Sequence, residues 1–312
     1  MFSFFKRKNK PEVPEWASFF SPDEYSKFLK AIEKYFYQKN VTYTLGDGMI
    51  NAGPNDFGFN ILGLTNVAQV CKFDDNRSYN EVVSQHFETM LRVNEFDKDF
   101  NKIIDDYEQI KEYLAVRLYD EGYFSSVGKE NVVGYTFVGN IYAALVFDLP
   151  DGIISIKPEQ AEKWNKDFDE LIATGIRNIR AKCPIDLSEE PFNDIKIWLA
   201  QGDHFFSGNI LFDLEKYPQL VGSYGSLIGI PHRHGVIIYP INDIAAVTAI
   251  NELIPLINGM HQEGPGSVSN QLLWYANGKI EDQPYKIDDD TIQFFPTDNF
   301  TSMLNSLAGD DE

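Results

Sequence analysis

Apolar residues recur along the chain with two different periods, and the change from one period to the other predicts an order of helices and strands. After Ser21, apolar residues recur every three or four positions, as they do on one face of an α-helix. Ser21 with Glu24, and Ser78 with Glu81, have the spacing of capping boxes, so a helix is expected to begin at each pair. The stretch 96–106 is charged and weakly patterned, which indicates a loop or a short turn.

Alternating apolar and polar residues predict strands between and after these helices. In the first half we expect strands at 41–45, 57–61 and 67–73, at 114–118, and in a hairpin at 133–137 and 141–147. In the second half we expect strands at 195–199, 205–212, 227–230, 236–239, 272–275 and 285–287, the last two on either side of the turn Asn277-Gly278. Together these patterns predict an α+β fold in which helices pack on one face of antiparallel sheets.

The second half also contains three helical patterns. Apolar residues at helical spacing run through 161–179, and Gly175 on that apolar face indicates close approach to another backbone. A second helix is expected over 242–257, where Pro255 should kink or end it. A third, frayed helix is expected near 300–307.

The length of the chain favours two packed units. Domains typically contain about 100–200 residues, and this chain has 312. The strongest turn signal near its middle is Pro150-Asp151-Gly152, where we place the boundary. The prediction is a flexible N-terminal segment at 1–20 and two α+β domains at 21–150 and 151–312. The two halves have nearly the same order of elements, which leads to the hypothesis of an internal duplication.

The net charge limits the possible partners. The chain has 27 Lys and Arg residues against 47 Asp and Glu residues, a net charge of −20. Binding to nucleic acids or to anionic membranes depends on basic residues, so both partners are disfavoured. A negative surface potential instead speeds encounter with cationic surfaces, which favours a protein partner of basic character.

The lack of a signal-peptide pattern and the small number of cysteines predict a cytoplasmic protein. In the segment 1–10 the apolar residues precede the charges, the reverse of a signal peptide, and no apolar stretch approaches the length of a membrane span. Cys71 and Cys183 are too few and too far apart for a disulfide framework, so we interpret them as small core residues in a reducing compartment.

The sharpest cluster of chemically versatile residues is Pro231-His232-Arg233-His234-Gly235. Residues two apart in a strand share a face, so His232 and His234 are candidates to hold a metal jointly. A third ligand would come from Asp203, His204 or His261. The simpler interpretation is a histidine pair that is hydrogen-bonded within the fold or exposed at the surface.

Other motifs carry little chemistry. Gly202-Asp203-His204 places a carboxylate beside an imidazole, but neighbours in a strand point to opposite faces. The segment 264–267 has no Lys-Ser/Thr of a phosphate loop, Ser223 lacks the spacing of a nucleophile elbow, and 288–290 lacks that of an EF-hand. The sequence contains no dinucleotide fingerprint or zinc-ribbon pattern, so no cofactor is predicted.

Two resemblances concern fold more than function. The order of elements is similar to that of small chaperones of bacterial secretion systems, an analogy of fold alone. Four segments of the second half are Ile176-Arg177-Asn178-Ile179-Arg180, 208–213, 230–238 and 269–278. Their content and order resemble the YtpQ-like family of uncharacterised bacterial proteins, although His234 replaces an acidic position of that pattern. That family has no established activity, so the resemblance implies a soluble bacterial protein and little chemistry.

Two functions from different classes therefore stand as hypotheses. The first is a non-enzymatic protein-interaction module of adaptor, chaperone or immunity type. The alternative is a metal-assisted hydrolase that uses His232 and His234. Bound metal that is lost when both histidines are replaced by alanine distinguishes the second from the first.

Overall fold

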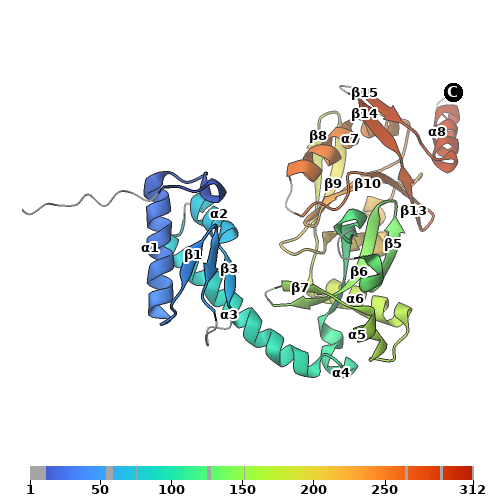
Figure 1. Cartoon of the computed structure of the whole chain (residues 1–312). Helices are drawn as coiled ribbons and strands as arrows, with labels where there is room; N and C mark the ends of the chain where they lie inside the picture. The colour runs from blue at the N-terminus through green and yellow to red at the C-terminus, as the bar shows by residue number, and fades with distance from the viewer. Residues whose placement is uncertain are drawn as a thin grey trace, which may run out of the picture. The chain divides into compact units, whose positions relative to one another are not determined.

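The computed structural model describes residues 12–53, 59–74, 76–124, 128–150, 152–263, 266–288 and 291–310. These residues form helices and antiparallel sheets (Figure 1), which confirms the predicted α+β class. The chain divides into two compact units, here called unit 1 (residues 1–102) and unit 2 (residues 103–312). Within the described residues, every helix is too short or too polar to cross a membrane.

The division between the units lies at 102/103 rather than near 150, where turn composition had placed it. Strands β6 (Ile141–Leu149) and β7 (Gly152–Ser155) lie on either side of the expected boundary and pair with each other, with Leu149 opposite Gly152. The proline and glycine therefore belong to a tight connection within one sheet. A turn signal marks a reversal of the chain, and only the pairing of the flanking strands shows whether a domain ends there.

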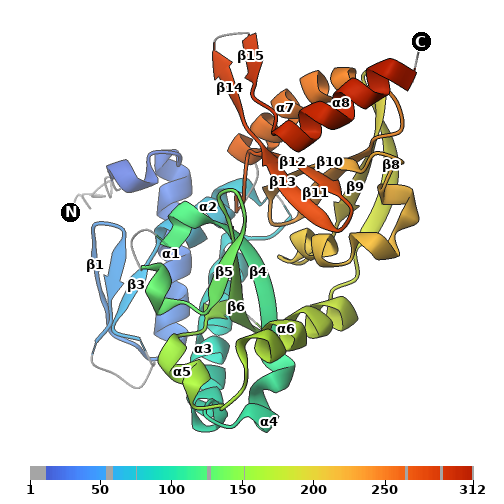
Figure 2. The same ribbon diagram turned by 90° about the vertical axis from the view of Figure 1, so that its right-hand side faces the viewer.

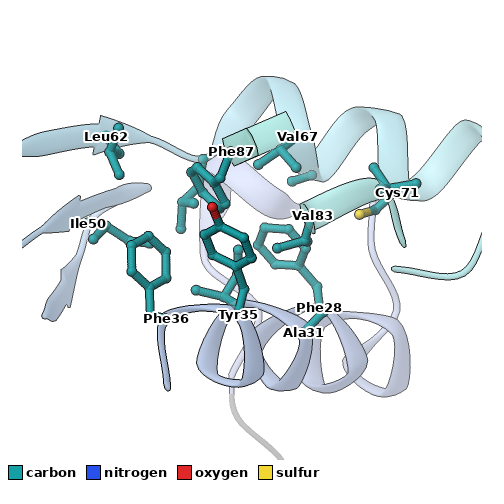
Figure 3. Packing of buried hydrophobic residues seen from close by; sticks show 14 of the residues in the cluster. Phe28, Ala31, Tyr35, Phe36, Ile50, Leu62, Val67, Cys71, Val83 and Phe87 are labelled. Atoms are coloured by element: carbon teal, nitrogen blue, oxygen red, sulfur yellow. The ribbon is translucent and has the colours of Figure 1, made fainter. Parts of the chain in front are cut away.

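Unit 1 packs helices against a small sheet. Its elements are a 3₁₀ turn (Glu15–Ala17), α1 (Pro22–Gln38), β1 (Thr44–Gly46), β2 (Met49–Asn51), β3 (Ile61–Gly63), α2 (Thr65–Phe73) and α3 (Tyr79–Ile103), which ends at the unit boundary. The strands pair antiparallel in the order β1-β2-β3. Figure 3 shows Phe36 of α1, Ile50 of β2 and Phe87 of α3 converging on the core of this unit.

The predicted starts of α1 and α3 are confirmed. The hydroxyl of Ser21 accepts a hydrogen bond from the Glu24 amide at 3.3 Å, and the Ser21 amide donates to the Glu24 carboxylate at 2.7 Å. Ser78 and Glu81 form the same reciprocal pair at the start of α3, at 3.4 and 2.7 Å. Each pair satisfies amides that the first turn of a helix leaves without partners.

Glu24 also forms an ion pair with Lys72 of α2 at 2.8 Å. The hydrogen bond from Lys72, followed by those from Ser21, lowers the pKa of Glu24 from 4.5 to about 2. A lowered folded-state pKa gives stability that is present above pH 4.5 and is lost as the pH falls towards 2. We therefore expect Glu24→Gln to lower the free energy of unfolding at neutral pH, by about 0.2–1 kcal/mol for so exposed a pair, and to leave it unchanged near pH 2.

Urea unfolding at several pH values measures this difference, and Glu33→Gln on the same helix is the control because Glu33 is exposed. If the wild-type chain kept the same excess in free energy of unfolding over Glu24→Gln down to pH 2, the stabilising role of the ionised Glu24 carboxylate would be contradicted.

Three predictions for unit 1 need correction. Residues 67–73 form the helix α2 rather than a strand, and its buried residues Val67 and Cys71 lie four apart on one face. In so short an apolar run both periods fit the sequence, and packing decides. The stretch 96–106 is helical as far as Ile103, with the rings of Phe96 and Phe100 stacked at 5.7 Å. Of the strand expected at 57–61, residues 57 and 58 lie outside the described residues, and β3 begins at Ile61.

Unit 2 contains two sheets. The smaller consists of β4 (Leu114–Asp120), β5 (Gly134–Val138), β6 and β7, with β6 paired to the other three. The short helix α4 (Tyr107–Ile110) precedes this sheet in the sequence, and the short helix α5 (Pro158–Glu162) follows it. Helix α6 (Phe168–Lys182) packs on β4. A side chain at Gly175 of α6 would meet the main chain of Ala115 at 2.9 Å, which confirms the close approach expected of this glycine.

The larger sheet of unit 2 has six antiparallel strands (Figure 2). Their order is β13 (Lys279–Gln283), β12 (Leu272–Ala276), β10 (Ser226–His232), β11 (Gly235–Pro240), β9 (Ile195–Gln201) and β8 (Asp186–Phe192). Helices α7 (Ala246–Glu263) and α8 (Asp298–Asp310) share one core with one face of this sheet, through Ile254 and Phe300 among others. A separate hairpin is formed by β14 (Tyr285–Asp288) and β15 (Thr291–Phe294). Helices α7 and α8 thus cover one face of the six-stranded sheet, as predicted.

Four details of unit 2 differ from the sequence predictions. Residues 207–212 form a 3₁₀ helix rather than a strand, here called η5 (Ser207–Phe212), and two further 3₁₀ turns follow it. The pattern over 161–179 is divided between α5 and α6, with Asn165 between them at a φ of 48°. Of the two outcomes expected at Pro255, the helix does not end there: α7 continues through it, because burial of its apolar face outweighs the lost backbone hydrogen bond. The turn Asn277-Gly278 joins β12 to β13, a strand that the sequence pattern did not indicate.

The negative charge of the chain is concentrated in unit 2. Unit 1 has 13 Lys and Arg residues and 14 Asp and Glu residues, a net charge of −1. Unit 2 has 14 basic and 33 acidic residues, a net charge of −19. The two units therefore present very different charges to a partner, a difference that the total of −20 conceals.

Candidate functional site

The three histidines singled out from the sequence lie in unit 2 around the connection between β10 and β11. His232 is the last residue of β10, and His234 lies in the two-residue turn before Gly235 opens β11. Their rings are 6.3 Å apart between centroids. His204 lies between β9 and η5. The strand spacing that would place His232 and His234 on one face does not apply, because His234 is outside the strand.

Hydrogen bonds within the fold use nitrogen atoms of all three rings. The Nδ1 atom of His232 accepts from the backbone amide of His234 at 3.2 Å. The Nε2 atom of His234 accepts from the Nε–H of Arg233 at 3.1 Å. His204 accepts from the Phe206 amide through Nδ1 at 3.2 Å, so its Nε2–H donates to the Pro184 carbonyl at 2.9 Å. These bonds show that the imidazoles shape the turn and the loop.

A metal centre of the predicted composition is not assembled. Across the described ranges, no three His, Cys, Asp or Glu side chains come together in a group able to hold a metal ion. Asp203, His204 and His261, the expected third ligands, therefore do not join the His232–His234 pair. Burial and then the charges of His234 and Arg233 lower the pKa of His232, which favours its neutral form.

The same turn belongs to a group of arginines and an aromatic ring that sequence reasoning missed. The guanidinium carbon of Arg233 lies 4.2 Å from the ring centroid of Phe205, and that of Arg117 in β4 lies 5.5 Å from the same centroid. Arg117 also lies 4.5 Å from the ring of Tyr119. We call Arg117, Phe205 and Arg233 the Arg–Phe cluster. Cation–π contacts of this kind hold guanidinium groups in place without neutralising them.

The residues of the Arg–Phe cluster are far apart in the sequence, which explains why no local motif indicates it. Phe205 precedes η5, which packs against β4, β9 and β11. The backbone amide of Ser207 in η5 donates to the Arg233 carbonyl at 3.4 Å. The side-chain amide of Asn209 donates to the carbonyl of Val116 at 2.8 Å, beside Arg117. Packing of η5 therefore brings the β10–β11 turn and β4 to one place.

The two cysteines, Cys71 and Cys183, have raised thiol pKa values. Burial and then the charge of Asp148 raise the pKa of the Cys183 thiol to about 11, and burial raises that of Cys71 to about 12. Both thiols are therefore protonated at neutral pH and are poor nucleophiles. Cys71 is buried, as predicted for a core residue, whereas Cys183 is half-buried.

Unit 1 has a surface hollow of about 420 Å³ along α1 and α3. It is lined mainly by amide, hydroxyl and lysine side chains, and its one carboxylate, Glu81, caps α3. The hollow therefore does not bring imidazoles and carboxylates together as general acid–base catalysis requires.

Comparison of the chain with protein-family models, with curated proteins and with solved structures finds no match. The resemblances to YtpQ-like proteins and to secretion chaperones remain predictions from the sequence.

Proposed function

We propose that the chain is a non-enzymatic protein-interaction module and that unit 2 binds a basic protein surface. The observation that carries this proposal is the charge of unit 2, −19, against −1 for unit 1. Such an excess raises the local concentration of cationic partners and speeds their association. Adaptor, chaperone and immunity-type roles all require binding of this kind.

The edge strand β8 supplies a surface suited to such binding. It is the last strand of the six-stranded sheet, so one of its sides has no neighbouring strand. Asp186 and Glu190 of β8, and Asp194 in the turn that follows, are exposed, and they form no ion pair among the described residues. Carboxylates on an edge strand discourage pairing with other copies, and they are free to bind lysine and arginine side chains.

The roles of the histidines and cysteines support binding rather than catalysis. His204, His232 and His234 use ring nitrogens in hydrogen bonds within the fold. The raised pKa values of Cys71 and Cys183 keep their thiols protonated. A cysteine nucleophile needs the opposite, a thiolate that is available at neutral pH.

Neutralising the β8 surface tests the proposal. Co-purification from the native cell at about 50 mM salt should recover a basic protein that is lost at about 300 mM salt, because screening weakens exposed charges. We expect Asp186→Asn/Glu190→Gln/Asp194→Asn to lower the association rate of that protein by about tenfold, as measured by biolayer interferometry. The matched control is Glu12→Gln/Glu33→Gln/Asp47→Asn, which removes three exposed carboxylates from unit 1 and should change the rate little.

Two results would overturn the proposal. One is a chain that stays alone and monomeric at every salt concentration. The other is stoichiometric bound metal that is lost in His232→Ala/His234→Ala, which would establish the alternative of a metal-assisted hydrolase.

A further inference from the structure

We propose that the Arg–Phe cluster is a binding site for a phosphate group, formed by the guanidiniums of Arg117 and Arg233. The site lies within unit 2 and is separate from the β8 surface proposed above to bind a basic protein. Three observations carry it, all made within the described residues. They are the position of the two guanidiniums on one aromatic ring, their lack of carboxylate partners, and buried polar atoms beside them that have no hydrogen-bond partner.

Both cations lie over the same aromatic ring. Because both stack on Phe205, at 4.2 and 5.5 Å, their guanidinium carbons cannot be farther apart than the sum of these distances. The edge-on ring of His234, 5.3 Å from Phe205, and the hydrogen bond from Arg233 to His234 fix the orientation of Arg233. Burial and then the charge of Arg117 lower the pKa of Arg233, as expected of like charges at short range.

Neither guanidinium is neutralised within the described part of the chain. No ion pair of Arg117 or Arg233 with a carboxylate is formed there, although unit 2 has 33 acidic residues. Asp203 is the nearest in sequence to Phe205, and its exposed carboxylate pairs with neither arginine. Two partly buried cations on one ring, with no carboxylate partner among the described residues, are costly unless a bound anion neutralises them.

Polar atoms beside the cluster also lack partners. Of the buried side-chain nitrogen and oxygen atoms without a hydrogen bond in the described residues, three belong to Arg117 (Nε), Ser207 (Oγ) and Asn209 (Oδ1). Ser207 is fully buried. The Nε–H of Arg117 and the hydroxyl of Ser207 are donors, so the oxygens of a bound anion would supply their missing bonds. The Oδ1 atom of Asn209 is an acceptor and is not assigned to the anion.

The chemistry of the donors selects phosphate. A guanidinium offers a planar fork of N–H groups that binds two oxygens of one anion, and two guanidiniums together match the charge of a phosphate dianion. A carboxylate has a single charge and is satisfied by one fork. Arg117, Phe205 and Arg233 are each partly exposed, so the site is reachable from solvent.

Calorimetric titration of the full chain with inorganic phosphate at low ionic strength tests the site. We expect saturable binding that Arg233→Gln weakens by about tenfold or more, the loss of a charge-assisted hydrogen-bonded pair. Arg117→Gln should weaken it similarly, with circular dichroism as the check that the variant folds. Should Arg117→Gln unfold, Arg233→Gln and Arg233→Lys in the turn carry the test, and the lysine should retain part of the affinity because it keeps the charge without the fork.

Control measurements separate a specific site from general electrostatic attraction. Arg177→Gln removes an exposed cation from α6 of the same unit and should leave phosphate binding unchanged. Phenyl phosphate that binds more tightly than inorganic phosphate would identify a phosphate monoester as the natural source, and equal affinities would identify free phosphate. The proposal is overturned by absence of binding up to about 10 mM phosphate, by equal weakening in Arg177→Gln, or by acetate that binds as tightly as phosphate.

Discussion

Replacing Phe87 with alanine is expected to lower the free energy of unfolding of unit 1 by about 3–5 kcal/mol. Phe87 on α3 is fully buried, and its ring lies 5.1 Å from those of Tyr35 and Phe36 on α1 (Figure 3). Alanine at this position removes the contacts that join the two helices and leaves a cavity that the neighbouring rings cannot fill. Urea unfolding gives the loss of stability, and amide hydrogen exchange in α1 and α3 assigns the loss to unit 1.

Tyr37→Ala is the matched control for this change. Tyr37 is an aromatic residue on α1 with 83% of its surface exposed, so its removal should change the free energy of unfolding by no more than about 0.5 kcal/mol. Equal losses for Phe87→Ala and Tyr37→Ala would show that the packing of α1 on α3 is wrongly described.

Gly225→Ala is expected to destabilise unit 2 by more than about 3 kcal/mol, since backbone strain and a steric overlap add. Gly225 precedes β10 with a φ of 89°, a conformation that residues with a side chain rarely adopt. A Cβ atom there would overlap the carbonyl oxygen of Tyr275 in β12. Because β10 pairs with β12 next to this position, the overlap can be relieved only by displacing a central pair of strands.

Gly278→Ala separates the two causes. Gly278, in the turn after β12, has a similar φ of 77°, but a Cβ atom added there would have no neighbouring atom within 4 Å. Its replacement should cost only the backbone strain, about 1–2 kcal/mol. Thermal unfolding of both variants measures the difference, and a Gly278→Ala variant as unstable as Gly225→Ala would refute the role assigned to the Tyr275 contact.

Some residues of the candidate site were indicated by a local sequence motif, and others are brought there only by the fold. The motif at 231–235 drew attention to the β10–β11 turn, because two histidines and an arginine stand there in a chain with five histidines. The metal hypothesis depended on treating His234 as a strand residue. Arg117 and Phe205, which join Arg233 in the Arg–Phe cluster, are far from the turn in sequence and carry no motif of their own.

The sequence by itself determined the elements whose signals are local. The capping boxes at Ser21 and Ser78 place the starts of two helices, because a hydroxyl and a carboxylate three residues apart satisfy the amides of the same turn. Only the tertiary structure decided that 67–73 is helical, that α7 continues through Pro255, and that the chain divides near 102 rather than 150. In these cases the local preference is worth at most a few kcal/mol, so the burial of apolar surface against distant residues determines the outcome.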